Sequence, residues 1–397
     1  MRRVYLDNNA TTPLLPEVFE AMRPYFCEKF GNASSIHQQG QQARSAVERA
    51  REQVAELLNC RPAEIVFTSG GTEGDNLALF GMLGNVKPGD HIISSAIEHH
   101  AVLNSCHRLQ ELGCAVTYLP VDGRGLVDPE DIRRALRAET KLISIMFANN
   151  ETGVLQAVNE IGKIATEADV YFHTDAVQAA GKVPVDVKEI GCDLLTISAH
   201  KFHGPQGAGA LFVRKGTLVQ PLLYGGRHER SRRAGTENLP GIVGLGKAAE
   251  IALRGFADGS VAQLAALRDR LENAVLENIE QVAVNGGGAP RTPNTANISF
   301  DCIEGEAMVI ALDLKGLSVS TGAACSSGAV EPSHVLTAMG LSADRARGSI
   351  RFSLGKQTTA EDIDFALELV PEVVSRLREI SPVYKKTAVS PQPSALS

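Results

Sequence analysis

Between residue 41 and about residue 256 the sequence alternates between helical and strand-like patterns, and this alternation is its most restrictive feature. Gln41–Leu58 places its apolar side chains on one helical face, namely Ala43, Ala46, Val47, Ala50, Val54, Leu57 and Leu58. Short apolar runs of strand length follow: Ile65–Thr68, His91–Ser95, Ala115–Leu119, Leu142–Phe147, Val170–Thr174, Leu194–Ser198 and Gly209–Val213. Apolar strands separated by helices predict an α/β fold with a mostly parallel sheet flanked by helices.

The pattern changes after residue 257. A long helix is predicted over Val261–Ile279, and the remaining elements are strands near Thr295–Phe300, Leu317–Ser320 and Ile350–Leu354 and helices near Gly305–Leu314 and Ala360–Ile380. We therefore expect a large α/β domain over 16–256 and a smaller α+β domain over 257–384. The pattern leaves open whether residues 1–15 pack on the smaller domain. Residues 385–397, rich in Ser, Pro and Ala, are expected to form a disordered tail.

Charge and cysteine usage exclude several classes of protein. The 39 basic and 46 acidic residues give a net charge of −7, which disfavours a basic surface that coats nucleic acid. No run approaches the ~18 apolar residues of a membrane span, and the N-terminus lacks the apolar core of a secretion signal. The seven cysteines are widely spaced and form no CxxC pair, which argues against a disulfide framework and a permanent metal site. A cytoplasmic protein is expected.

Polar clusters follow four of the predicted strands. They are SGGTEGDN after residue 68, ANNETG after residue 147, DAVQ after residue 174 and AHKFHGPQG after residue 198. In a parallel α/β sheet, ligands bind beyond the carboxyl ends of the strands. The four clusters should therefore meet at one edge of the sheet and form a ligand site there.

The cluster Ser69-Gly70-Gly71-Thr72-Glu73 lies between a strand and a helix. Its backbone N–H groups at a helix N-terminus suit a single phosphate, and the glycines permit close approach. It is neither a P-loop nor a dinucleotide GxGxxG motif. The alternative is an ordinary turn with a Ser or Thr cap.

Two further residues suggest which phosphorylated ligand is bound. Lys201 lies at a strand end between two histidines, where desolvation would lower its pKa and make it able to form a Schiff base; alternatively it is a solvated lysine in a turn. Asp175 is placed to pair with a pyridinium nitrogen; alternatively it caps a helix. Together with the glycine turn, these residues are the parts required by pyridoxal phosphate.

Two residues of the C-terminal part suggest reactivity toward a substrate. Cys325 lies among small residues in STGAACSSG, where a mobile thiolate would act as a nucleophile; alternatively it is a tolerated small residue in a turn. Arg351 is suited to a bidentate hold on a carboxylate; alternatively it forms a surface ion pair. The arginines of GGRHERSRRAGTEN form either a solvated face or a contact with a phosphate or a second subunit.

The chain resembles the cysteine desulfurases of the NifS/IscS type, within the class V aminotransferase-like, fold-type I pyridoxal-phosphate enzymes. The resemblance covers roughly residues 4–383. It rests on the motifs YLDNNATT, GNASSIH, SGGTEGDN, EHHAV, NNETG, HTDAVQA, SAHKFHGPQG, RAGTEN, STGAACSSG and IRFSLG. The motifs NNETG and RRAGTEN and the ending LREISPVY favour the nitrogen-fixation (NifS-like) branch.

This resemblance implies a role for each matching residue. The cofactor, pyridoxal 5′-phosphate, would be bound by Gly71, Thr72, His99, Asn150, Asp175, Gln178, Ser198, His200, Lys201 and Thr236. Among these, Lys201 would bond the cofactor covalently and move protons at the substrate Cα. Asp175 would pair with the pyridine nitrogen, Gln178 would donate to the phenolic oxygen, and His99 would stack on the ring and assist proton transfer.

The remaining implied roles concern the substrate and partners. Asn150 and Arg351 would hold the carboxylate of L-cysteine, and Cys325 would take its sulfur as a persulfide and release alanine. Thr236 would reach the phosphate of a second subunit, which implies a homodimer. The persulfide would pass to an iron–sulfur scaffold or another acceptor protein, and whether Cys325 transiently binds a cluster is left open. The alternatives are an aminotransferase or selenocysteine lyase on the same fold, and a non-catalytic sulfur-carrier scaffold.

Overall fold

The computed structural model describes residues 2–83, 87–322, 332–382 and 384. The described helices are α1 (Pro16–Met22), α2 (Pro24–Cys27), α3 (Gln38–Leu57), α4 (Gly71–Leu83), α5 (His100–Glu111), α6 (Pro129–Ala135), α7 (Val158–Glu167), α8 (Val187–Ile190), α9 (Leu239–Ala257), α10 (Ser260–Asn278), α11 (Gly305–Leu314), α12 (His334–Ala338), α13 (Ala343–Arg347) and α14 (Ala360–Ile380). Within this described part of the chain, no helix combines the length and apolarity needed to cross a membrane.

The large sheet has seven strands in the order β2-β8-β7-β6-β5-β3-β4. These strands are β2 (Ile65–Thr68), β3 (His91–Ser95), β4 (Ala115–Leu119), β5 (Thr140–Ser144), β6 (Tyr171–Asp175), β7 (Leu194–Ser198) and β8 (Gly209–Val213). Strand β8 runs antiparallel to both neighbours, whereas the other neighbouring pairs are parallel. The predicted α/β class with a mostly parallel sheet is therefore confirmed.

Most predicted strands of this sheet coincide with observed ones, but β5 lies two to three residues earlier than expected. Its pairing with β3 ends at Ser144. On the other side, bonding to the β6 segment continues, because Phe147 donates its N–H to Asp175 at 2.8 Å. The apolar run 142–147 therefore extends beyond β5, into a segment that is still bonded to β6 but no longer to β3.

Helix α3 shows why the apolar periodicity was informative. The predicted face packs into the main core, with Val47, Val54 and Leu58 essentially inaccessible to solvent. The helix starts at Gln38, three residues before the predicted start. The imidazole of His37 accepts the N–H of Gly40 at 3.2 Å and satisfies a donor of the first turn.

The C-terminal part has its own core. Helices α10, α11 and α14 cover a three-stranded antiparallel sheet of order β12-β10-β9, made of β12 (Ser349–Ser353), β10 (Thr295–Phe300) and β9 (Val282–Val284). Its buried side chains include Leu271, Phe300 and Val370, separate from the cluster of the large sheet. Between α9 and α10 the chain turns at Gly259, whose φ of +81° favours glycine. On these two cores we propose a domain boundary near residue 257.

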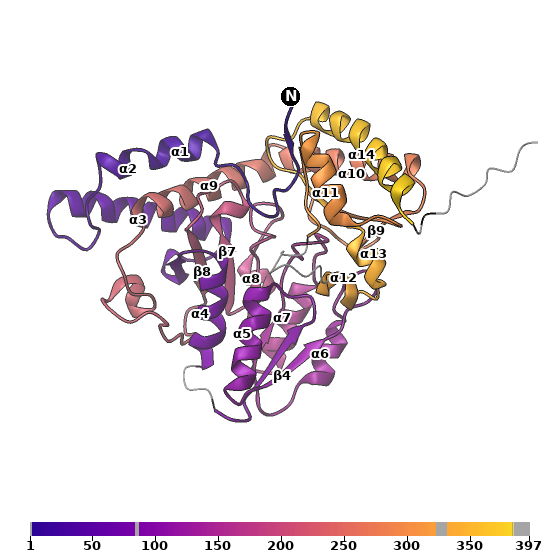
Figure 1. The fold of residues 1–397 in the computed structure, drawn as a ribbon. Coiled ribbons are helices and arrows are strands. Elements are labelled where there is room, and N and C mark those ends of the chain that lie inside the picture. Colours follow the sequence, from indigo (N-terminus) through magenta and orange to yellow (C-terminus); the bar gives the residue numbers. More distant parts are fainter. Residues whose placement is uncertain (1, 84–86, 323–331, 383, 385–397) are drawn as a thin grey trace, which may run out of the picture.

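The N-terminal strand joins the C-terminal core. Strand β1 (Val4–Tyr5) pairs in parallel with β11 (Leu317–Ser318), and Val4 packs into the C-terminal cluster. Figure 1 shows the indigo N-terminal end beside the orange and yellow helices α11 and α14. Strand β11 is shorter than predicted, because Ser320 pairs with β12 at Arg351 instead.

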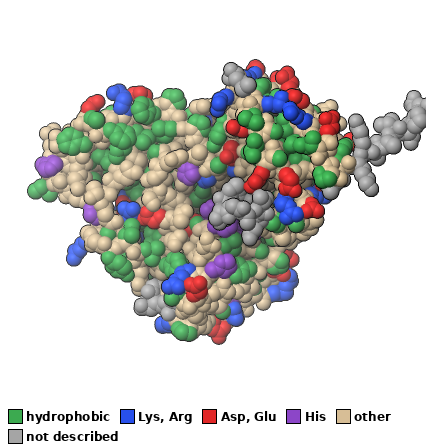
Figure 2. All heavy atoms as spheres, viewed as in Figure 1, with side chains coloured by type: hydrophobic (Ala, Val, Ile, Leu, Met, Phe, Trp, Pro, Cys, Tyr) green, Lys and Arg blue, Asp and Glu red, His purple; other side chains and the backbone are tan. Residues whose placement is uncertain are grey.

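After β1 the chain runs to the large sheet. Thr12 donates its N–H to the carbonyl of His200 at 2.9 Å, just beyond β7. The segment from β1 to Thr12 thus connects the two cores next to the carboxyl ends of the large sheet. On the face shown in Figure 2, basic and acidic side chains are interspersed, without a broad field of one sign.

Candidate functional site

A cavity of about 380 Å³ lies at the carboxyl ends of β2, β6 and β7. All four polar clusters contribute residues to it. The predicted site residues that line it are Gly71, Thr72, His99, Asn150, Asp175, Gln178, Ser198, His200, Lys201 and Arg351. Ten side chains or backbone positions that are spread over 280 residues of sequence therefore face one space.

Among the predicted site residues that the structure describes, Thr236 is the one that does not line this cavity. Thr236 is exposed and lines two other hollows, one beside Arg233 and the other beside Phe30. Cys325 lies outside the described residues. Its described neighbours Ser320 and Gly322 do line the cavity.

Lys201 ends a 3₁₀ turn (Ala199–Lys201) that directly follows β7. Its Nζ donates to the carbonyls of Asn9 and Ala10 at 2.6 and 2.7 Å. Burial, followed by the positive charge of Arg351, lowers its pKa from 10.5 to about 8. The neutral, nucleophilic form of the amine is therefore more populated near neutral pH than in a solvated lysine, although the protonated form still predominates below pH 8.

Asp175 ends β6 and is 6% exposed. One carboxylate oxygen accepts the N–H of Val177 at 2.8 Å, which supports a turn rather than a helix. Burial raises its pKa to about 6, although the bond from Val177 and the charge of Lys201 oppose this. A cationic N–H in the cavity would therefore be a favourable partner for this carboxylate.

Behind Asp175 lies a group of buried polar side chains. Asp75 reaches to 3.6 Å from Nε2 of His173, and burial raises the pKa of Asp75. Burial lowers the pKa of His173 to about 3, so this imidazole is neutral. Burial also raises the pKa of Glu98 to about 8. Near neutral pH these groups therefore carry less negative charge than their number suggests.

His99 caps α5, where its Nδ1 accepts the N–H of Ala101 at 3.1 Å. Desolvation in the cavity, then the charges of Lys201 and His100, lower its pKa to about 4. The ring is therefore neutral at pH 7, with its proton on Nε2, because Nδ1 is an acceptor. A neutral imidazole of this kind is suited to stacking on another ring.

The glycine turn begins α4 and faces Ser198. A Cβ on Gly71 would lie 2.8 Å from Cγ2 of Val177, so a larger residue would require the turn or Val177 to move. The first N–H groups of a helix have no partner within the helix and attract anions. Glu73 bridges the turn and Arg233, because its carboxylate accepts the N–H of Ser69 at 2.8 Å and pairs with Arg233 at 2.8 Å.

Arg351 is 4% exposed and is held from two sides. Its guanidinium donates to Asp7 at 2.7 Å and to the carbonyl of Asn150 at 2.9 Å. Its Nε is buried without a hydrogen-bond partner among the described residues. Arg351 therefore forms a buried ion pair with Asp7 rather than a surface one, and the two described bonds leave further N–H groups of the guanidinium for a ligand.

Asn9 lines the cavity, although no role was predicted for it from the sequence. Its carbonyl accepts from Lys201 and also from Gln178, at 2.9 Å. Its side-chain oxygen accepts from Lys182 at 3.0 Å. DNNATT carried the family resemblance, but nothing in its spacing indicated these contacts, which join residues more than 160 positions apart.

Glu151 is a second residue whose role was missed. It is 2% exposed, and Ser333 donates to its Oε2 at 2.5 Å. A Cβ on Gly322 would lie 3.3 Å from the same oxygen. Glu151 thus contacts described residues on both sides of 323–331, at the edge of the cavity. The motif NNETG was the available signal, but only Asn150 was selected from it.

The chain is similar to known proteins over nearly its whole length. Residues 4–365 match the family model described as aminotransferase class-V. The chain is 52% identical over 386 residues to a cysteine desulfurase IscS of Dictyoglomus turgidum, covering 97% of this chain and 98% of that protein. It is equally identical to a cysteine desulfurase IscS of Methanosarcina thermophila, with 97% and 95% covered. A solved structure described as a NifS-like protein has a TM-score of 0.88 at 39% identity, covering 94% of this chain and 100% of that one.

Proposed function

The chain belongs to the aminotransferase class-V family, among its cysteine desulfurases of the IscS and NifS type, and from this we propose a specific chemistry for the cavity. It binds pyridoxal 5′-phosphate and L-cysteine, releases L-alanine, and transfers the sulfur to Cys325. The observation that carries the proposal is the meeting of Lys201, Asp175 and the glycine turn in one cavity.

The residues present fit this cofactor. The N-terminus of α4 and the hydroxyl of Ser198 supply donors for a phosphate. The carboxylate of Asp175 is buried and suits a pyridinium N–H, and the amine of Lys201 has the lowered pKa of a Schiff-base lysine. The neutral imidazole of His99 is available to stack on the ring.

Bound pyridoxal phosphate supplies an electron-withdrawing ring that stabilises negative charge at the substrate Cα. Asp175 keeps the ring nitrogen protonated, and Lys201 removes the proton from Cα and later returns one. Gln178 is in place to donate an amide N–H to the phenolic oxygen. The rate enhancement expected from such a positioned proton carrier is roughly 10²–10⁴-fold.

The substrate carboxylate is assigned to Arg351 and Asn150. The position of Arg351 in the cavity lining supports this assignment, because the guanidinium has five N–H groups and the bonds to Asp7 and Asn150 use two of them. Asp7 holds the guanidinium in position, since it accepts from the same group at 2.7 Å. The hydrogen bond to the carbonyl of Asn150 fixes the distance between the two binding residues.

Sulfur transfer is assigned to Cys325. Its thiolate forms an S–S bond with the substrate sulfur while the Cβ–S bond breaks. The electron pair left on Cβ takes up a proton, which gives alanine and a persulfide without an external oxidant. The lining of the cavity supports this role, because Ser320 and Gly322, which precede Cys325 by five and three residues, contribute to it.

A homodimer is the proposed assembly. Large apolar side chains are exposed on this chain, among them Phe30 at 63%, Ile36 at 90% and Tyr224 at 85%. Thr236 is exposed and lines a hollow with Phe30, which suits a residue that reaches a second subunit.

The proposed dimer can be tested by sedimentation, which should give a particle mass of twice the 42.3 kDa of one chain. A fully active species of the single-chain mass would contradict the dimer.

The destination of the sulfur is proposed from chemistry. A persulfide must be passed on before the next turnover, and an iron–sulfur scaffold or another acceptor protein would receive it. The nitrogen-fixation branch, the cytoplasmic location and transient cluster binding by Cys325 stay predictions.

The product of L-cysteine tests the proposed function. The holoenzyme with L-cysteine and a dithiol reductant should form alanine and sulfide in equal amounts, because each turnover releases both. Amino-acid analysis and a sulfide assay measure the two products. A keto acid in place of alanine would indicate transamination and contradict the desulfurase chemistry.

A further inference from the structure

Lys182 is a buried lysine next to the site to which neither the motifs nor the proposed chemistry gives a role. It is 7% exposed and follows Gln178 by four residues. Its Nζ donates to Oε1 of Gln178 at 2.5 Å and to the side-chain oxygen of Asn9 at 3.0 Å. Both acceptors belong to residues that line the 380 Å³ cavity.

These bonds determine how the amide of Gln178 is oriented. Its Oε1 faces the donor Lys182, while its Nε2 donates to the carbonyl of Asn9 at 2.9 Å. An amide nitrogen has two N–H groups, so one remains for the cavity. A charged or a neutral lysine amine supplies the two donors that these acceptors require. If the Gln178 amide were reversed, its N–H groups would face the donor Lys182 and its oxygen would face the carbonyl oxygen of Asn9.

Lys182 also orders the N-terminal segment. The side-chain oxygen of Asn9 accepts from Asn294 at 3.0 Å in addition to Lys182. The backbone carbonyl of the same residue accepts from Lys201. Lys182 therefore connects Asn9, whose carbonyl accepts from the Lys201 amine, with Gln178, which is assigned to the phenolic oxygen of the cofactor.

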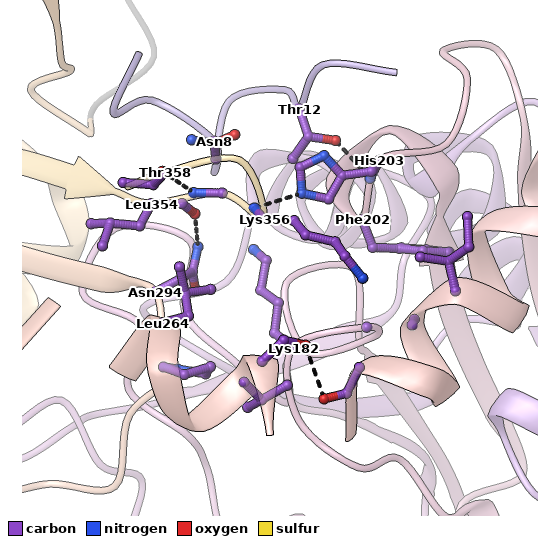
Figure 3. A pocket seen from close by; sticks show the side chains of 18 of the residues that line it. Asn8, Thr12, Lys182, Phe202, His203, Leu264, Asn294, Leu354, Lys356 and Thr358 are labelled. Carbon is purple, nitrogen blue, oxygen red and sulfur yellow. Dashed lines mark hydrogen bonds between the residues drawn. The ribbon is translucent and has the colours of Figure 1, made fainter. Parts of the chain in front are cut away.

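A second cavity of about 140 Å³, which we call the rear cavity, reaches the other side of Lys182. Its lining includes Leu15, Lys182, Phe202, Leu264 and Leu354. Figure 3 shows Lys182 extending into this space, with Leu264 on one side and Phe202 on the other. The lysine stem thus lies along one cavity while its amine bonds residues of the other.

We propose that Lys182 is a positioning residue of the active site, which fixes the Gln178 amide and Asn9 so that an N–H of Gln178 faces the cofactor oxygen. This inference rests on the proposed function, because it assigns Gln178 to that oxygen. Lys182 touches neither substrate nor cofactor and acts only through its two partners.

A double-mutant cycle tests the proposal. Lys182→Met, Gln178→Leu and the double variant are compared by cofactor affinity, from equilibrium dialysis of the holoenzyme, and by the pH midpoint of the bound cofactor's absorbance. Lys182→Met should weaken cofactor binding about tenfold, because it leaves a buried acceptor unpaired. It should shift the pH midpoint in the same direction as Gln178→Leu, and the double variant should lose clearly less affinity than the two single losses combined, because the two residues share one route.

Two control variants separate positioning from folding. Lys182→Arg keeps N–H donors, and the rear cavity offers room for the longer side chain, so near-normal affinity is expected. Lys356→Met alters another lysine of the same cavity and should leave both readouts unchanged. A lowered melting temperature with additive losses in the cycle would show a merely structural role and overturn the proposal.

Chemical rescue gives an independent readout. Lys182→Ala opens the space that the side chain occupies toward the rear cavity, and propylammonium should restore cofactor affinity at least threefold where 1-propanol does not. Equal effects of the two compounds would contradict the requirement for an N–H donor. If Gln178→Leu shifts the absorbance midpoint and Lys182→Met does not, the Lys182 inference alone is wrong. If neither shifts it, the role proposed for Gln178 also fails.

Discussion

Replacing Lys201 by alanine is expected to remove the covalently bound cofactor absorbance and to lower alanine formation by about 10³-fold or more. The reason is that Lys201 supplies both the amine that bonds the cofactor and the group that moves the proton at Cα. Absorbance spectra after dialysis and single-turnover alanine measurements would report the two losses. Lys163→Ala, on the exposed surface of α7, is the matched control and should behave like the unaltered protein.

The pH dependence provides a second readout of the same amine. Burial and Arg351 lower the pKa of Lys201 to about 8, and only the neutral amine is nucleophilic. Cofactor uptake by the cofactor-free protein should therefore accelerate as pH rises through about 8 and then level off. The alanine variant should lack this rise.

A persistent covalent spectrum in Lys201→Ala would contradict the assignment. The buried Lys182 would then be the residue to examine next, because it too borders Asn9 and Gln178. The double variant Lys201→Ala, Lys182→Met would decide between the two lysines. Loss of the spectrum in Lys201→Ala alone, with an unchanged melting profile, would support the proposed Schiff base.

Cys325→Ala is expected to keep the bound cofactor but to lose sulfur transfer, with alanine formation reduced about 10²-fold or more. A single addition of L-cysteine without reductant should add one sulfur atom to the unaltered protein and none to the variant, as measured by intact-protein mass. The amount of alanine should match the added sulfur, because one alanine is formed for each persulfide.

The control for this experiment is Cys27→Ala, since Cys27 is an exposed free cysteine outside the cavity. The Cys27→Ala variant should gain one sulfur atom, as the unaltered protein does. Sulfur on both Cys325→Ala and the unaltered protein would remove Cys325 from the mechanism. Undiminished alanine formation by Cys325→Ala would do the same.

Much of the fold followed from local pattern. The apolar faces of α3 and the strand runs of β2, β3, β4, β7 and β8 were correctly located, because each element must bury a periodic set of side chains wherever it lies in the fold. The polar clusters could be placed at strand ends because the apolar runs that precede them had located the strands. What the pattern did not contain was the direction of β8 or the pairing of β1 with β11, since strand partners are chosen by the whole sheet.

The candidate site divides in the same way. Lys201, Asp175 and the glycine turn were recognisable in the sequence, because each combines a reactive residue type with a position at the end of a strand. Arg351 was predicted to be a carboxylate ligand from the sequence, but its ion pair with Asp7, which lies 344 residues away, could not be predicted from the sequence around it.

The α/β class, the gathering of polar clusters at one sheet edge and the candidate reactive residues could be predicted from the sequence, because these depend on periodicity and on side-chain chemistry within short segments. Short segments could not reveal that Asn9 joins Lys201, Gln178 and Lys182, or that the carboxylate of Glu151 accepts from Ser333, because these contacts depend on how the whole chain folds. Those contacts are formed by hydrogen bonds between distant segments, and burial of polar groups makes their pairing obligatory once the two cores have packed.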